Sequence, residues 1–229
     1  MMLDVKEVSR LLSVSEKTLY RWLLKGEIPA YKIGQSYRFN RVELLEWATA
    51  HKIKVSTEII DDTLATGSET PALTEAINAG GIYYNVAGGD KESILKSIVA
   101  TMKLPEDVDR NFLTDALLAR ENLGTTGIGD GIAIPHVRNP VVFHINTPVL
   151  SLCFLDHPVD FAAIDGKPVD TVFTLMTPTV RSHLHLLSRL GYALHLPSLR
   201  QILHAGSSRE EIIAAFGEVE IELNRKAMG

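Results

Sequence analysis

The first fifty residues follow three helical patterns of apolar positions and one strand-like pattern. Apolar residues recur at helical spacing over Asp4–Leu12, Glu16–Lys25 and Arg41–Ala50, which predicts three helices. Between the last two, every second residue is apolar or aromatic on either side of Gly34. That spacing predicts a small β-hairpin. Two short helices, a tight turn, a hairpin and a third helix together describe a small winged helix-turn-helix domain.

A polar, acidic segment rich in Ser, Thr and Gly follows at residues 56–71. Such a composition indicates a linker between two domains. We therefore expect one domain over residues 1–55 and a second over residues 72–222, with a tail at 223–229. The second domain alternates helical and strand-like stretches, which is typical of an α/β domain with a central mixed sheet flanked by helices. Helices are expected over 91–102, 110–121, 181–196 and 208–216, and strands over 131–134, 148–155 and 170–176.

The charge of the chain is divided unevenly between these two parts. The net charge of −5 over 229 residues argues, taken alone, against nucleic acid as a partner. Residues 1–55, however, hold ten Lys and Arg against six Asp and Glu, a net charge of +4, which leaves −9 for the remainder. This asymmetry indicates two modules with different partners.

Cysteine content and hydropathy limit the cellular setting. Cys153 is the only cysteine, which excludes an intramolecular disulfide and favours a reducing, cytoplasmic location. No stretch approaches the roughly 18 consecutive apolar residues of a membrane span. The first residues also lack the apolar core of a signal peptide. We therefore expect a cytoplasmic protein without a membrane partner.

The second helix of the N-terminal domain is the candidate recognition helix, because in this fold it lies in the major groove with its first residues toward the base edges. Basic residues on the hairpin could contact phosphates. The candidate DNA-binding residues are Glu16, Lys17, Tyr20 and Arg21 on the helix, with Lys32 and Arg38 on the hairpin. From these residues alone, a small helical domain that binds protein is the alternative.

Residues 2–50 resemble the excisionase/MerR-like family of DNA-binding domains. The matching stretches are Asp4–Leu12, Val14–Trp22 and Gly26–Gly34. The family often has basic residues after the wing glycine, whereas this chain has Gln35–Ser36, so the wing is expected to hold phosphates weakly. The long dimerisation helix of MerR regulators is also missing. Specific binding would therefore need a homo-oligomer formed elsewhere in the chain.

A glycine-rich run ends in a histidine at position 136. Four glycines fall within the eight residues from 124 to 131, and Pro135 precedes His136. Glycines let backbone N–H groups approach a phosphate, which makes Thr126, Gly127 and Gly129 candidate phosphate-binding residues. Pro135 favours an extended residue before it and so fixes where the histidine emerges. The alternative is a structural turn followed by a surface histidine.

Two more side chains point to the same chemistry. On the helix expected from residue 181, His183 falls within the apolar stripe and His185 opposite it, so we expect His183 to face inward and His185 outward. Two such divergent histidines do not predict a metal site. Arg120 projects with the stripe that begins at Phe112 and therefore needs an anion or a path to solvent. A satisfied core histidine is the alternative for His183.

Residues from about 73 to 220 resemble the enzyme IIA domain of the fructose/mannitol/nitrogen-regulatory class of the bacterial phosphotransferase system. The motifs that carry the resemblance are Leu118–His136, Pro158–Asp170 and His183–His185. The resemblance implies a phosphohistidine carrier with transferase-like chemistry. It also implies an HPr-type phosphocarrier protein as donor, and neither cofactor nor metal, because the phosphoryl group is received covalently.

The resemblance also assigns roles to individual residues. It implies that His136 accepts the phosphoryl group, that His183 is a second active-site histidine, and that Arg120 is the active-site arginine. Thr125 occupies a Ser/Thr position near the phosphate. Val137 stands where several relatives have glycine, which bears on the surface where the partner docks.

Three functions are consistent with these features. The first is a regulator in carbon or nitrogen metabolism, whose enzyme IIA domain reports phosphotransferase status and whose helix-turn-helix domain binds DNA. The second is a phosphoryl carrier that feeds the IIB component of a sugar permease. The third is an adaptor that binds regulatory protein targets without binding DNA.

Overall fold

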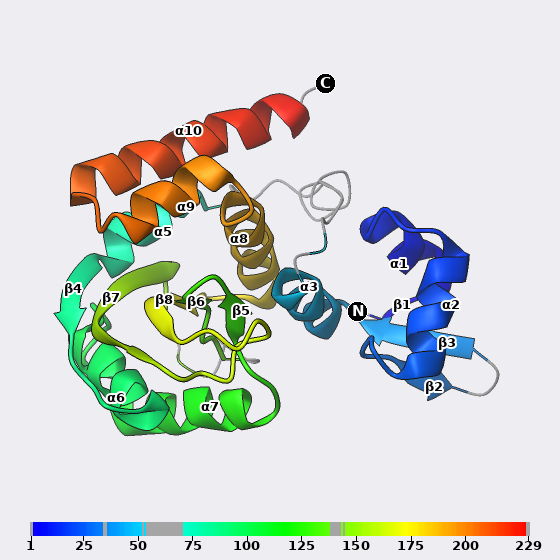
Figure 1. The fold of residues 1–229 in the computed structure, drawn as a ribbon, viewed down its shortest axis with the longest axis horizontal. Helices are drawn as coiled ribbons and strands as arrows, with labels where there is room; N and C mark the ends of the chain where they lie inside the picture. The colour runs from blue at the N-terminus through cyan, green and yellow to red at the C-terminus, as the bar shows by residue number, and fades with distance from the viewer. Residues whose placement is uncertain are drawn as a thin grey trace.

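The computed structural model describes residues 2–33, 36–51, 53, 71–137, 143 and 145–227. Within these ranges the chain forms a small N-terminal domain and a larger C-terminal domain (Figure 1). Each domain has its own β-sheet, one of three strands and one of five. The expected linker at 56–71 lies outside the described residues except for Pro71, as does Gln35 of the wing.

The N-terminal domain has the predicted order of helices and hairpin. Local sequence explains its boundaries: the Asp4 side chain accepts the Glu7 N–H, Ser15 caps the second helix, and Gly26 ends that helix with a positive φ of 67°. A short first strand, which the sequence did not predict, pairs with the third to give the order β1-β3-β2. The elements are β1 (Met2–Leu3), α1 (Val5–Leu11), α2 (Glu16–Lys25), β2 (Tyr31–Ile33), β3 (Ser36–Asn40) and α3 (Arg41–Ala50).

A mixed sheet forms the centre of the C-terminal domain, as predicted. Its order is β4-β7-β8-β6-β5, in which β4–β7 and β8–β6 are parallel and the other two pairs are antiparallel. The sequence did not predict β4, nor the β5 strand that turns the glycine run into a hairpin. The strands are β4 (Ile82–Val86), β5 (Gly127–Gly129), β6 (Ile132–Ala133), β7 (Val149–Val159) and β8 (Val169–Met176).

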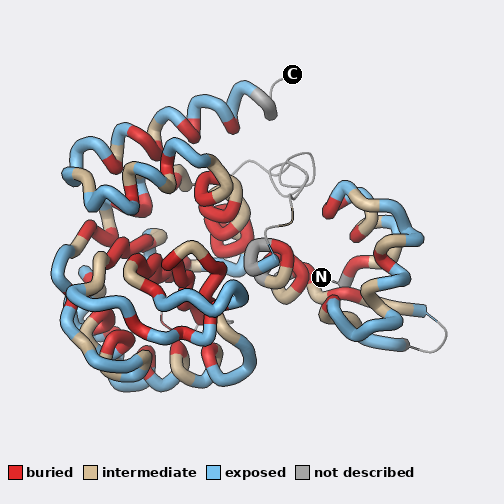
Figure 2. The backbone as a smooth tube through the Cα atoms, viewed as in Figure 1, coloured by how far each residue is buried: buried red, intermediate tan, exposed pale blue. Residues whose placement is uncertain are grey.

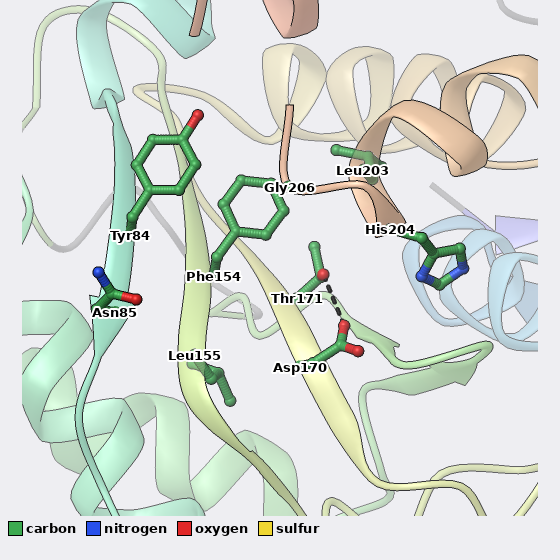
Figure 3. A pocket seen from close by; sticks show the side chains of 9 residues that line it. All are labelled: Tyr84, Asn85, Phe154, Leu155, Asp170, Thr171, Leu203, His204 and Gly206. Atoms are coloured by element: carbon green, nitrogen blue, oxygen red, sulfur yellow. Dashed lines mark hydrogen bonds between the residues drawn. The ribbon is translucent and has the colours of Figure 1, made fainter. Parts of the chain in front are cut away.

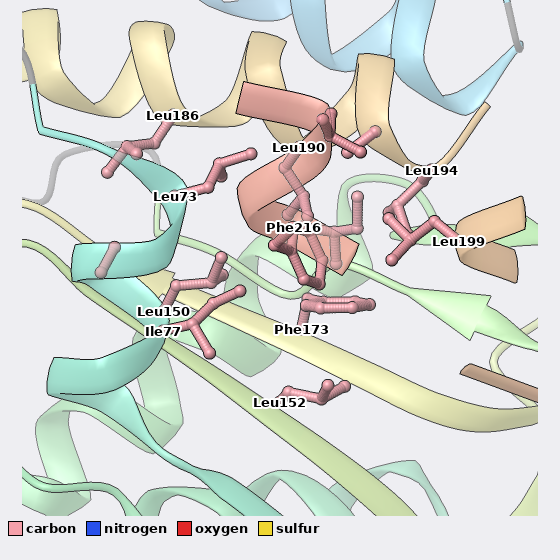
Figure 4. Close-up of a cluster of buried hydrophobic side chains, with 14 of the residues drawn as sticks. Leu73, Ile77, Leu150, Leu152, Phe173, Leu186, Leu190, Leu194, Leu199 and Phe216 are labelled. Carbon is pink, nitrogen blue, oxygen red and sulfur yellow. The ribbon is translucent and has the colours of Figure 1, made fainter. Parts of the chain in front are cut away.

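Helices cover both faces of this sheet (Figure 1). One face packs on α6 and α7 through a cluster that includes Leu95 and Val172. The other face packs on α5, α8, α9 and α10 through a cluster that includes Phe173 and Leu150 (Figure 4). Of these helices, α8 is buried along most of its length (Figure 2). The helices are α5 (Leu73–Gly80), α6 (Lys91–Thr101), α7 (Arg110–Asn122), α8 (Val180–Ala193), α9 (Pro197–His204) and α10 (Arg209–Ala227).

Three expectations about these elements need correction. The helix expected over 181–196 ends at Ala193, because Pro197 starts a separate helix. The last helix continues through residue 227 with Leu223 buried, so the tail boundary expected at 222 falls inside α10. Phe112 is 52% exposed and packs on the ring of Phe143 at 5.4 Å, so it does not belong to the buried stripe of α7.

The absence of a side chain at Gly80 allows the close contact between α5 and β7. A Cβ atom built on Gly80 would lie 2.3 Å from the Leu150 carbonyl oxygen. The neighbour is backbone, so it cannot move away as a flexible side chain would. This glycine therefore sets how closely α5 approaches the sheet.

We predict that Gly80→Ala lowers the free energy of unfolding by about 2 kcal/mol or more, because overpacking here shifts backbone. Gly217→Ala in α10 is the matched control, since its Cβ would meet nothing within 4 Å. The control should raise stability by up to about 1 kcal/mol through helix propensity. Urea unfolding measures both values, and equal changes in the two variants would contradict the packing described here.

Candidate functional site

His136 emerges at the end of β6, beside β8. Ile132 and Ala133 pair in parallel with β8, and His136 continues this pairing as an isolated bridge to Leu175. The histidine is only 3% exposed. The extended approach expected from Pro135 therefore leads to a buried histidine, not to a surface one.

A backbone hydrogen bond sets the tautomer of this ring. Nδ1 of His136 lies 2.7 Å from the carbonyl oxygen of Ile134. Because a carbonyl oxygen only accepts, Nδ1 carries the hydrogen and donates it. In the neutral ring, Nε2 then holds the lone pair and is the nucleophilic atom.

The second histidine lies beside the first. His183 is in the first turn of α8, is fully buried, and its ring centroid is 5.3 Å from that of His136. Thr179 caps this helix by accepting the Ser182 N–H at 3.1 Å. The positive end of the helix dipole therefore lies at the histidine pair, where it favours a bound anion.

His185 does not face outward as the sequence predicted. It is 2% exposed, because α8 contacts β8, α5, α10 and α3 and is thus covered on more than one side. Burial lowers the pKa of His185 to about 4, and the positive charges of Arg189 and Arg181 act in the same direction. His185 is therefore neutral near pH 7.

The glycine run forms a tight hairpin between β5 and β6. Asp130 and Gly131 form its turn, with positive φ values of 52° and 74°. At the far end of the hairpin from this turn, the carbonyl of Thr126 accepts the Ile134 N–H at 3.0 Å. The structure thus brings Thr126 close to the histidine, whereas Gly129 pairs with Ile132 next to the turn.

The threonines of the run are held by fixed hydrogen bonds. Thr125 Oγ1 donates to the Phe161 carbonyl at 2.6 Å and accepts the Gly127 N–H at 2.9 Å. Thr126 gives both its N–H and its hydroxyl to the carboxylate of Glu121. The Gly127 N–H is thus already used within the loop, so the predicted cradle is at least partly occupied by internal bonds.

Glu121 is a site residue that sequence reasoning missed. It is buried, binds both donors of Thr126, and forms an ion pair with Lys91 at 3.1 Å. Its signal was present in the sequence, since Leu113, Leu117 and Glu121 share one face of α7 at a spacing of four. A carboxylate on that buried stripe is expected to have hydrogen-bond partners.

Arg120 lies at the start of the same loop. It is half-buried, and its guanidinium donates to the Gly124 carbonyl at 2.9 Å. Arg120 thus stands in the last turn of α7, just before the glycine run. This places a cation at the entrance to the loop rather than deep in the core.

The residues proposed for DNA contact lie mostly on the surface. Glu16, Lys17, Tyr20 and Arg21 are exposed on α2, and Lys32 is exposed on β2. Arg38 is half-buried on β3. The preceding residue on that strand is Tyr37, whose ring centroid lies 6.5 Å from that of Tyr20 on α2. The apolar side of α2 packs inward through Leu19, so the charged side is left to solvent.

A shallow pocket of about 230 Å³ lies elsewhere, between the strands and the end of α9 (Figure 3). It contains a 2.8 Å hydrogen bond from Thr171 to Asp170. The residues that line it do not include His136, His183 or Arg120. The histidine pair is thus a separate site. Within the described parts of the chain, no helix combines the length and apolar character that a membrane span needs.

Over residues 75–219 the chain matches the family described as phosphoenolpyruvate-dependent sugar phosphotransferase system, EIIA 2. The chain belongs to this EIIA family. Residues 2–52 match a helix-turn-helix domain family. The predicted fusion of a helix-turn-helix domain to an EIIA domain is therefore confirmed.

Relatives of the EIIA domain include nitrogen regulatory proteins and fructose-specific components of the phosphotransferase system. A nitrogen regulatory protein of Pseudomonas aeruginosa is 36% identical over 152 residues, which cover 65% of this chain and 96% of that protein. The fructose-specific EIIABC component of Bacillus subtilis is 31% identical over 62% of this chain, but this covers only 22% of that protein. The crystal structure of nitrogen regulatory protein IIA-Ntr from Neisseria meningitidis aligns with a TM-score of 0.53 and 31% identity. The aligned residues make up 59% of this chain and 92% of the Neisseria chain.

We predict that acidification destabilises the protein through His185. The unfolded residue takes up a proton near pH 6.5 and the folded one only near pH 4, so within this window the unfolded state binds more protons. The contribution is about 2 kcal/mol of stability lost between pH 6.5 and pH 5. Urea unfolding against pH should show this loss reduced in His185→Leu. The exposed His157→Leu is the control, and an identical pH dependence in wild type and His185→Leu would contradict the burial.

Proposed function

We propose that this protein is a phosphotransferase-linked regulator that accepts a phosphoryl group on His136 from an HPr-type phosphocarrier and binds DNA through its N-terminal domain. The observation that carries the proposal is the buried pair of His136, which follows β6, and His183, in the first turn of α8. The two ring centroids are 5.3 Å apart, and the hydrogen bond from Nδ1 to the Ile134 carbonyl leaves Nε2 of His136 as the nucleophile.

In this mechanism, Nε2 of His136 attacks the phosphorus of the carrier's phosphohistidine. The new N–P bond forms as the old one breaks, and the electron pair of the broken bond returns to the carrier's imidazole. His136 gains positive charge as it reacts, and its Nδ1–H bond to the Ile134 carbonyl stabilises that charge. The ring needs no deprotonation, because the attacking atom already holds a lone pair.

Nearby groups would stabilise the phosphoryl oxygens. His183 is placed to donate a hydrogen bond to them, and the N-terminus of α8 adds a positive dipole. Arg120 supplies the cation at the loop. Phosphoryl transfer depends mainly on such positioning and charge stabilisation, and in this proposal His183, Arg120 and the α8 N-terminus supply both in place of a metal.

The regulatory assignment rests on the N-terminal domain. The Pseudomonas relative corresponds to 65% of this chain, which leaves the helix-turn-helix domain as an addition. That domain has a net charge of +4 and exposes Lys17, Tyr20 and Arg21 on α2. Basic residues on an exposed recognition helix favour the phosphate backbone of DNA.

A carrier feeding a sugar permease is the second candidate, because a relative is named as a fructose-specific EIIABC component. In that case the phosphoryl group would pass from His136 to an EIIB partner. Transfer to an EIIB protein, together with an absence of DNA binding, would favour this carrier function over the regulatory one.

We predict that His136→Ala abolishes phosphorylation, because the nucleophile is removed. His183→Ala should still be labelled, but with slower transfer or a shorter-lived phosphohistidine. Incubation with radiolabelled phosphoenolpyruvate and the general phosphotransferase proteins measures both. His204→Ala, at an exposed position on α9, is the control. Full labelling of His136→Ala would refute the assignment.

We predict that Arg21→Ala weakens binding to mixed-sequence duplex DNA and lowers the slope of log affinity against log salt by about 1, as expected for one lost phosphate contact. Fluorescence anisotropy of a labelled duplex over a salt series gives both quantities. Lys103→Ala, exposed on the EIIA domain, should leave them unchanged. Absence of binding by the wild type even at low salt would count against a DNA-binding function.

A further inference from the structure

The third helix of the N-terminal domain contacts the EIIA domain. Figure 1 shows α3 beside α8, and α3 contacts both α8 and β5. Leu184 of α8 is 9% exposed and belongs to the hydrophobic cluster of the N-terminal domain, together with Leu44 and Leu45 of α3. The helix-turn-helix domain is therefore docked on the EIIA domain through a shared apolar cluster.

The two elements that α3 contacts flank the histidine pair. Leu184 directly follows His183, whose ring lies against that of His136. On the other side, Thr126 directly precedes β5 and binds the backbone of Ile134. The docked helix thus lies on both walls of the site, in which His136 is 3% exposed and His183 fully buried.

We propose that the α8–β5 face around His136 is a binding surface for the chain's own α3, and that α3 and the phosphocarrier compete for it. The competition rests on the proposed phosphoacceptance by His136. For transfer, the carrier must bring its phosphorus into line with Nε2 of His136. A carrier surface cannot reach a histidine that is 3% exposed while α3 is docked on both walls of its site.

The phosphorylated histidine fits the docked form poorly. A phosphoryl group adds three oxygens and about −1.5 to −2 charges, and burying that much charge is costly even where donors pair with some of the oxygens. Once His136 is phosphorylated, α3 is therefore expected to stay undocked. Docking leaves Lys17, Tyr20 and Arg21 of α2 exposed, so the direct competition is with the carrier and not with DNA.

Histidine modification tests the docking without any phosphocarrier. Diethyl pyrocarbonate reacts with accessible imidazoles, and peptide mass spectrometry of the full chain gives the rate at each one. His157, whose side chain is 82% exposed, is the internal standard. In the wild type, we expect His136 to react at least about tenfold more slowly, since a docking free energy of about 1.4 kcal/mol already gives that factor.

Leu184→Glu should undock α3, because it puts an unpaired charge into the shared cluster. We expect the His136 rate to rise about tenfold, which corresponds to an undocking cost of about 1.4 kcal/mol. Ile221→Glu is the matched control, since it adds the same charge at a position of α10 that is 55% exposed. It should leave the His136 rate unchanged.

A second variant leaves every packed residue intact. A specific protease site inserted between residues 56 and 70 allows the two domains to be cut apart after folding. Cutting removes the millimolar effective concentration that a short linker provides, so at low micromolar protein α3 should dissociate and His136 should react. An unchanged circular dichroism spectrum shows that both domains stay folded, and an unchanged His157 rate shows that the reagent is equally active in both samples.

The same samples, offered the phosphocarrier and phosphoenolpyruvate, complete the test. Faster labelling of Leu184→Glu and of the cut protein supports the competition. Equal reactivity of His136 and His157 in the wild type, or no rise after cutting, overturns the docking surface. If His136 becomes reactive but no sample is labelled, the proposed phosphoacceptance fails and the competition with it, while the docking of α3 stands.

Discussion

The parallel pairing of β6 with β8 is the constraint on which the site depends. It aligns Ile132 and Ala133 with β8 and continues as the bridge from His136 to Leu175. Because β8 leads within a few residues into α8, the same register sets the position of His183. Two histidines 47 positions apart in sequence therefore meet as a pair. A shift of one residue in this pairing would turn His136 to the other face of the sheet.

Hydrogen bonds within the glycine hairpin support that register. The Asp130–Gly131 turn closes β5 on β6, and Glu121 holds Thr126 at the other end of the hairpin. Lys91 partly neutralises this buried carboxylate. At least one glycine of the run is needed for packing within the domain. A Cβ atom built on Gly127 would lie 2.8 Å from the Cβ atom of Ala163. The loop that precedes His136 is therefore fixed by packing from several elements.

Sequence patterns predicted those parts of the structure that local physics determines. The cap at Ser15 and the stop at Gly26 fix the two ends of α2 without help from the rest of the chain. Helical periodicity also placed His183 inward. It failed for His185 because periodicity identifies one face, while α8 packs against several elements. The role of Glu121 and the docking of α3 could not be predicted either, because both depend on contacts between distant segments.

The central claim is that His136 accepts the phosphoryl group through Nε2. Nitrogen–proton correlation spectra of the phosphorylated, ¹⁵N-histidine-labelled full chain test it most directly, because they distinguish the two ring nitrogens. The account predicts a phosphorus coupling at Nε2 of His136, with Nδ1 protonated and bonded to the Ile134 carbonyl. A phosphoryl group on Nδ1 of His136, or on another residue, would contradict it.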